Sequence, residues 1–265
     1  MYHEILSKKF EEMGVRLKFS SYFRFSRIWD TNFSINIQRD KKGEFFEMWQ
    51  REGHEMEISV LDHRPDLKHL LLMVKQKENE SIVHNKFLCG HDERFWFVAG
   101  VHPKSSTVRD AQELLKPFLV RKAQWNARIK RKNQYKRRNK AFIRQGEWFF
   151  IPEPELKADD KYILKHEPIR RGGSKPHRLE YAYRTGGTTV YVCRRFPNGL
   201  VESEYKKYIT EYPSDKQNWQ TMVREPRVYG KGRVTHKDHK TVILHGWHRV
   251  IMNDEVSSNK VAFLD

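Results

Sequence analysis

Four of the thirteen histidines lie close together near the end of the chain, in the stretch THKDHKTVILHGWH. They are His236, His239, His245 and His248. Imidazole nitrogens bind divalent metal ions, and imidazole exchanges protons near neutral pH. With Asp238 between the first two, the stretch could hold a metal ion or act as a general acid–base cluster.

Strand geometry limits how many of these histidines can share one metal ion. If His245 and Gly246 make a two-residue turn, His239 and His248 face the same side of the resulting hairpin. At roughly 3.3 Å per residue they are then about 13 Å apart. One metal ion cannot bridge that distance.

The candidate catalytic residues are therefore His236, Asp238 and His239, which could converge locally. A metal centre needs one more strong ligand from elsewhere, and His177 is the candidate beside His236 and His239. The alternative is that these histidines lie on a polar strand face or against aromatic rings, because HxDH is too short to be a specific motif. The sequence predicts no cofactor, and a divalent metal ion stays an alternative that depends on these histidines.

The largest charge anomaly is the stretch from Lys116 to Arg144, called the basic segment below. It holds twelve Lys or Arg residues and no Asp or Glu, whereas the whole chain has 51 basic and 34 acidic residues and a net charge of +17. Without the segment, 39 basic and 34 acidic residues remain. Because unpaired like charges repel each other, such a stretch needs a polyanionic partner.

Aromatic residues lie among these cations and could stack on nucleobases. The segment therefore predicts contact with nucleic acid, and RNA is favoured over DNA because exposed aromatic rings on basic arms suit single strands and structured RNA. A membrane surface is disfavoured, since the apolar face fades after Ile129. A solvated surface helix is the plainer alternative, although such helices usually mix charge signs. The predicted contact residues are Arg121, Lys122, Trp125, Arg128, Lys130, Arg131, Lys132, Tyr135, Lys136, Arg137, Arg138, Lys140 and Arg144.

Two further motifs carry weaker signals. The loop around RRGGSK offers Arg170, Arg171 and Lys175 as a second phosphate contact or as an ordinary surface loop, without the spacing of a P-loop. In CGHDE, residues 89–93, a cysteine two residues from a histidine could be a nucleophile with its base. Side chains at i and i+2 diverge in a turn, so a polar loop is favoured. A metal ligand at Asp92 or Glu93 has no support from spacing.

Alternating and apolar runs indicate an α+β fold with two regions of mainly antiparallel sheet, joined by a strongly basic helical arm. We expect a β-rich domain over residues 1–105, a helix and the basic arm over 106–145, and a second α+β domain with C-terminal strands over 146–265. Thr107 and Asp110 indicate a helix start. The arm beyond residue 130 lacks an apolar face and is expected to order on its partner.

These patterns leave three hypotheses for function. The first is a non-catalytic nucleic-acid-binding protein, associated with RNA or a ribonucleoprotein. The second is a metal-dependent nuclease or other nucleic-acid-processing enzyme, and the third is a structural subunit of a ribonucleoprotein that also contacts other protein subunits. Two distant cysteines without a CxxC pair fit a reducing cytoplasm. No apolar run is long enough for a membrane span.

Overall fold

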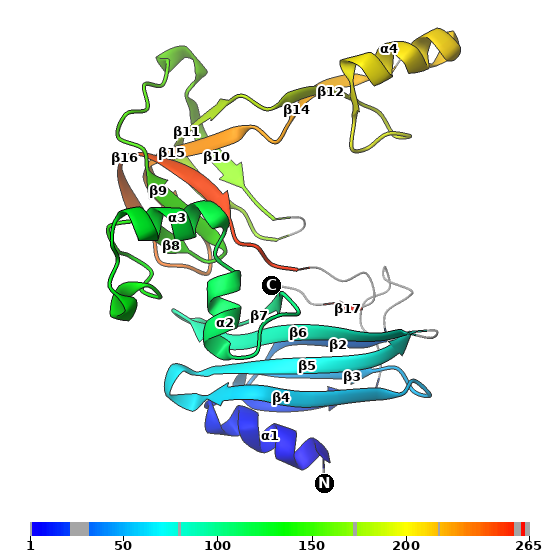
Figure 1. Ribbon diagram of the computed structural model, residues 1–265, viewed down its shortest axis with the longest axis vertical. Coiled ribbons are helices and arrows are strands. Elements are labelled where there is room, and N and C mark those ends of the chain that lie inside the picture. The colour runs from blue at the N-terminus through cyan, green and yellow to red at the C-terminus, as the bar shows by residue number, and fades with distance from the viewer. Residues whose placement is uncertain are drawn as a thin grey trace.

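The computed structural model describes residues 2–21, 32–78, 81–171, 174–216, 218–256 and 261–262. Two four-stranded sheets, in the orders β1-β3-β2-β17 and β4-β5-β6-β7, form the first region (Figure 1). Most neighbouring strands run antiparallel, whereas β1 and β17 each add a parallel edge. The strands are β1 (Arg16–Ser20), β2 (Phe33–Asp40), β3 (Gly43–Gln50), β4 (Met56–Arg64), β5 (His69–Glu78), β6 (Ser81–Asp92), β7 (Phe95–Val101) and β17 (Val261–Ala262).

One hydrophobic core joins these two sheets and the first helix, α1 (Tyr2–Glu12). Phe10 of α1 contacts Phe46 of β3 with ring centroids 4.8 Å apart, and Phe33 of β2 lies 5.9 Å from Phe87 of β6. Leu70, Leu72 and Val74 of β5 alternate along the strand and all lie in this core, as expected for one face of a strand.

The second face of the β4–β7 sheet is covered by α2 (Val108–Leu114). Leu71 and Leu88 meet Val108 and Ala111 there, so β5 is buried on both faces and reads as a continuous apolar run. Thr107 caps α2 and forms a capping box with Asp110, as the sequence predicts.

The second region is a six-stranded antiparallel sheet in the order β10-β11-β15-β16-β9-β8. A separate three-stranded sheet, β13-β12-β14, projects from it with α4 (Glu202–Glu211) at its end (Figure 1). The strands are β8 (Ile143–Gln145), β9 (Trp148–Pro152), β10 (Leu164–Ile169), β11 (His177–Thr185), β12 (Thr188–Val192), β13 (Leu200–Val201), β14 (Gln220–Arg224), β15 (Arg227–Thr235) and β16 (Val242–Met252).

The predicted helical arm is wrong. In the basic segment α3 covers only Phe118–Asn126, a short 3-10 turn follows at Arg131–Asn133, and the chain then enters β8. An apolar cluster anchors the segment to the sheet: Val120 of α3 and Ala141 and Phe142 at its far end are buried against Phe149 of β9. Apolar residues at both ends of a charged stretch hold it as a compact loop.

Gly186 and Gly187 connect two sheets, because β11 belongs to the six-stranded sheet and β12 to the small projecting sheet. A 3-10 turn ends at Lys216, and strand β14 begins at Gln220. The helices are short, and none among the described residues is long and apolar enough to cross a membrane.

The two cysteines are free thiols in different surroundings. Cys89 of β6 is fully buried, and burial raises the pKa of its thiol well above its usual range, whereas Cys193 is partly exposed. Thiolates react with iodoacetamide and buried thiols do not. We expect iodoacetamide to label Cys193 in the native protein and to reach Cys89 only in denaturant, as read by peptide mass spectrometry. Equal native labelling of both would contradict this packing.

Candidate functional site

The pairing of β11 with β15 brings His177 and His236 together. Arg178 of β11 lies opposite Thr235 of β15, so the residues just outside this pair, His177 and His236, are neighbours across the end of the ladder. Their rings stack with centroids 4.1 Å apart. They are 59 positions apart in the sequence, and the register between the two strands makes them adjacent.

His239 reaches the same point through the loop between β15 and β16. The buried amide of Gln145, at the end of β8, closes this loop by donating to the backbone carbonyls of Val234 (3.2 Å) and Lys240 (2.6 Å). The ring of His239 consequently lies 4.7 Å from that of His236 and 5.4 Å from that of His177, between centroids.

Gly146, in the turn between β8 and β9, forms the floor of the cluster. Its φ of +58° favours glycine, and a Cβ there would lie 2.8 Å from Nε2 of His239 and 3.3 Å from Nε2 of His177. The two Nε2 atoms therefore point toward the same small space above the glycine. A side chain at residue 146 would occupy it.

The three imidazoles lie close enough together to hold a metal ion. One ring nitrogen from each of His177, His236 and His239 lies within 4.8 Å of the others. Among the described residues, both ring nitrogens of His177 and Nδ1 of His239 are buried without a hydrogen-bond partner. Unpartnered buried nitrogens are costly unless a ligand satisfies them.

Burial also fixes the protonation state of His177 and His239. Loss of solvation, with repulsion from the neighbouring imidazoles, lowers the pKa of His177 to about 3. Loss of solvation, with repulsion from His236 and Arg137, lowers the pKa of His239 to about 4. Both rings are therefore neutral at neutral pH, which is the form that binds a metal ion. His236 is held by the backbone N–H of Asp238, which donates to its Nδ1 at 3.1 Å.

The cluster opens into a cleft of about 610 Å³ between the two regions of the protein. Its wall beside the cluster carries Glu147, whose Oε1 lies 3.9 Å from Nδ1 of His177. Burial raises the pKa of Glu147. Tyr135 and Lys136 of the basic segment line the same cleft. A molecule held by that segment could therefore extend to the histidines.

Comparisons of this chain with protein-family models, with curated proteins and with solved structures find no significant match.

Among the predicted site residues, His177, His236 and His239 come together, whereas Asp238 turns aside and bonds to Lys175 at 2.6 Å. The turn considered at His245 and Gly246 does not form, because both residues lie inside the continuous strand β16.

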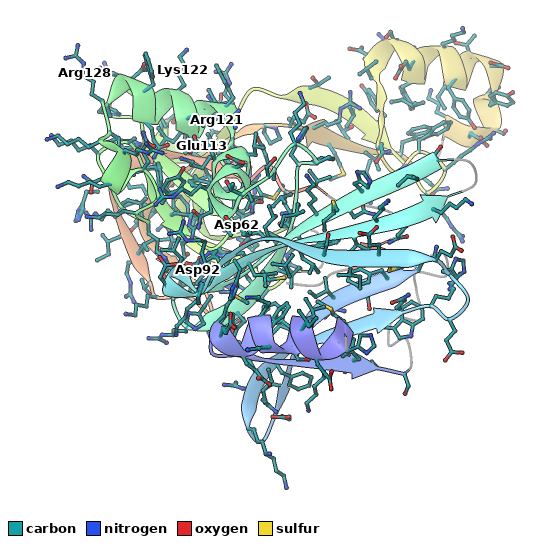
Figure 2. All side chains as sticks on the ribbon, turned by 60° about the horizontal axis from the view of Figure 1, so that its bottom comes forward. Asp62, Asp92, Glu113, Arg121, Lys122 and Arg128 are labelled. Carbon is teal, nitrogen blue, oxygen red and sulfur yellow. The ribbon has the colours of Figure 1, made fainter. Side chains whose placement is uncertain are left out.

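The basic segment presents many of its cations to solvent. Figure 2 shows Lys122 and Arg128 projecting outward from the region of α3, with Arg121 and Glu113 nearer to the body of the protein. Trp125 is 84% exposed and Phe118 is 66% exposed on the same helix, an unusual exposure for large apolar rings. The exposed cations of the segment are Lys122, Arg128, Lys130, Arg131, Lys132, Lys136, Arg138 and Lys140.

Other predicted contact residues of the segment are engaged within the protein. Arg137 pairs with Asp92 and Glu93 in the turn between β6 and β7, and Arg144 pairs with Asp92 at 2.7 Å. Lys116, at the start of the segment, is buried beside Glu113. These ion pairs attach the segment to the first region, so their cations are less available to an external anion.

The loop that carries Arg170, Arg171 and Lys175 also has some cations paired within the protein and some exposed. Arg171 pairs with Glu255 and donates to Asn253, while Lys175 pairs with Asp238. Arg170 is exposed. The loop therefore contributes Arg170 as its most available cation among the described residues.

Sequence reasoning missed the residues that support the histidines. Gln145, Gly146 and Glu147 form a short run before the strand Trp148–Pro152, and Glu93 approaches from the first region. The glycine after Gln145 was a detectable turn signal. Nothing local indicated that this turn meets a histidine loop ninety residues later.

We expect Gly146→Ala to damage the cluster in two ways. The new side chain requires a strained backbone at φ +58° and displaces two imidazoles. The free energy of unfolding should fall by roughly 3 kcal/mol, measured by urea denaturation.

Gly186→Ala is the matched control. Gly186 has a similar φ of +67°, but a Cβ there meets nothing within 4 Å. Its substitution should cost only the backbone strain, about 1 kcal/mol. Equal losses in the two variants would show that the space above Gly146 is not tightly occupied.

Proposed function

We propose that this protein is a metal-dependent hydrolase that acts on nucleic acid, with the metal ion held by His177, His236 and His239. The observation that carries the proposal is the convergence of three imidazoles at the edge of a cleft, two of which, those of His177 and His239, have buried nitrogens without a hydrogen-bond partner. Three protein ligands leave a fourth position for water, which is the arrangement of catalytic zinc sites.

Three nitrogen ligands favour zinc or another first-row transition metal over magnesium or calcium, which prefer oxygen. A metal ion held there would make a water molecule acidic enough to attack phosphorus near neutral pH. Glu147 would accept the proton of that water as its oxygen bonds to phosphorus, and would give the proton to the leaving oxygen as the P–O bond breaks.

The substrate class follows from the charge and exposure of the basic segment. Eight exposed cations from Lys122 to Lys140 can neutralise phosphates, and the exposed ring of Trp125 offers a surface on which a base can stack. Lys136 and Tyr135 also line the cleft that ends at the histidines. RNA is favoured, as a single strand exposes its bases to such a ring.

A second candidate is a nucleic-acid-binding protein without catalysis, either a factor or a structural subunit of a ribonucleoprotein. The exposed cations and Trp125 favour binding by themselves, whatever the histidines do. In that case the three histidines hold a metal ion that only stabilises the fold.

The metal centre is tested by elemental analysis and a cleavage assay. Purified protein should hold one zinc-like ion per chain, and His177→Ala, His236→Ala or His239→Ala should remove it because each deletes a ligand. Cleavage of labelled RNA should be lost with the metal, while RNA binding persists. His245→Ala is the control, since His245 is exposed and outside the cluster. If none of the three substitutions changes the metal content, the metal centre is refuted. If the substitutions remove the metal but the wild-type protein does not cleave RNA, the second candidate is favoured.

The nucleic-acid surface is tested by replacing Lys130, Arg131, Lys132, Arg138 and Lys140 with Gln, all of which are exposed. Wild-type binding to single-stranded RNA should fall steeply with salt, with a slope of about −6 for log K against log salt if all eight exposed cations engage phosphates. The quintuple variant should bind more weakly and show a shallower slope, measured by fluorescence anisotropy.

The control carries the same charge change on the first region: Lys8, Lys41, Lys42, Lys77 and Lys104 to Gln. Its affinity and salt slope should stay close to wild type. Equal weakening by the two sets would mean that net charge, and not the basic segment, drives binding. Metal content should be unchanged in both.

A further inference from the structure

The turn between β6 and β7 belongs to the first region, yet it reaches the histidine cluster of the second. Oε2 of Glu93 lies 3.6 Å from Nδ1 of His239 and accepts the backbone N–H of Lys240 at 3.0 Å. Glu93 also pairs with Arg137 of the basic segment. One nearly buried carboxylate thus contacts the histidine loop and the basic segment together.

The two nitrogens of His239 face different surroundings. Nε2 points toward the space above Gly146, where Nε2 of His177 also points. Nδ1 faces Glu93 and has no hydrogen-bond partner among the described residues. In metal sites a ligating imidazole donates its other N–H to a carboxylate or carbonyl, which fixes the tautomer and turns the free nitrogen to the metal.

We propose that Glu93 is a positioning residue for the metal centre: it accepts the Nδ1 proton of His239 and directs Nε2 to the ion. The first region then contributes a side chain to the metal centre. This inference rests on the proposed metal centre, but it does not depend on the substrate or on cleavage.

The backbone of the turn supports a requirement for this side chain. Glu93 has a φ of +52°, a left-handed conformation that glycine or asparagine adopts more readily. The backbone at this position is strained for glutamate and would be less strained for glycine or asparagine. Its neighbour Asp92 pairs with Arg137 and Arg144 but has no contact with His239 among the interactions of the described residues.

The test compares zinc affinity, by competition with a chromophoric chelator, in Glu93→Ala, Glu93→Gln and Asp92→Asn. Glu93→Ala should weaken zinc binding by about 10- to 100-fold. Glu93→Gln keeps an oxygen acceptor without the charge and should lose less. Asp92→Asn should stay within about threefold of wild type, since Asp92 pairs with Arg137 and Arg144 of the basic segment and not with His239.

The visible spectrum of the Co²⁺-substituted protein separates positioning from general destabilisation. A changed ligand geometry at His239 should alter the spectrum in Glu93→Ala and leave it unchanged in Asp92→Asn. Wild-type affinity and spectrum in Glu93→Ala, with metal lost in His239→Ala, would overturn the role of Glu93 while keeping the centre. Absence of zinc binding in the wild type would overturn the centre and the role of Glu93 together. RNA binding by the quintuple lysine and arginine variant is independent of both outcomes.

Discussion

The register between β11 and β15 is the constraint on which the candidate site depends. Because Arg178 lies opposite Thr235, His177 at the start of β11 and His236 just after β15 lie at the same end of this strand pair. A slip of one residue would turn His177 to the other face of the sheet. Buried Leu179, Ala182 and Val234 hold this register, since the same slip would expose them.

Burial of both ring nitrogens without a hydrogen-bond partner distinguishes His177 from the other described histidines. His248 is also buried, but its Nδ1 contacts the carbonyl of Gly246, whereas both nitrogens of His177 are unsatisfied among the described residues. A protein interior normally pairs such groups because desolvation is expensive. A bound ion would offset the desolvation cost by bonding to a nitrogen of each histidine. The structure of the cluster therefore supports a metal centre more strongly than the HxDH pattern does.

The basic segment combines two roles that its composition could not separate. Val120 and Phe142 anchor its ends in a small apolar core, and Arg137 and Arg144 tie it to acidic residues of the first region. Eight other cations of the segment are exposed, and so is Trp125. Ion pairs with Asp92 and Glu93 also connect this segment to the turn that reaches His239, so the surface proposed for substrate and the cluster proposed for metal share one carboxylate.

The sequence by itself determined the α+β class, most strands of the first region, the capped helix α2, and the set of three histidines as metal-ligand candidates. Period-two alternation and capping chemistry are local, so they are readable without a fold. Only the tertiary structure decided that the basic segment is a compact loop and not a helical arm, and that Gly186 and Gly187 join two different sheets. It also decided that Gln145, Gly146 and Glu93 support the histidines. Those outcomes depend on strand order and register between residues roughly 60 to 150 positions apart. Strand order and register are fixed by the burial of whole sheet faces, so they cannot be detected in the local sequence pattern.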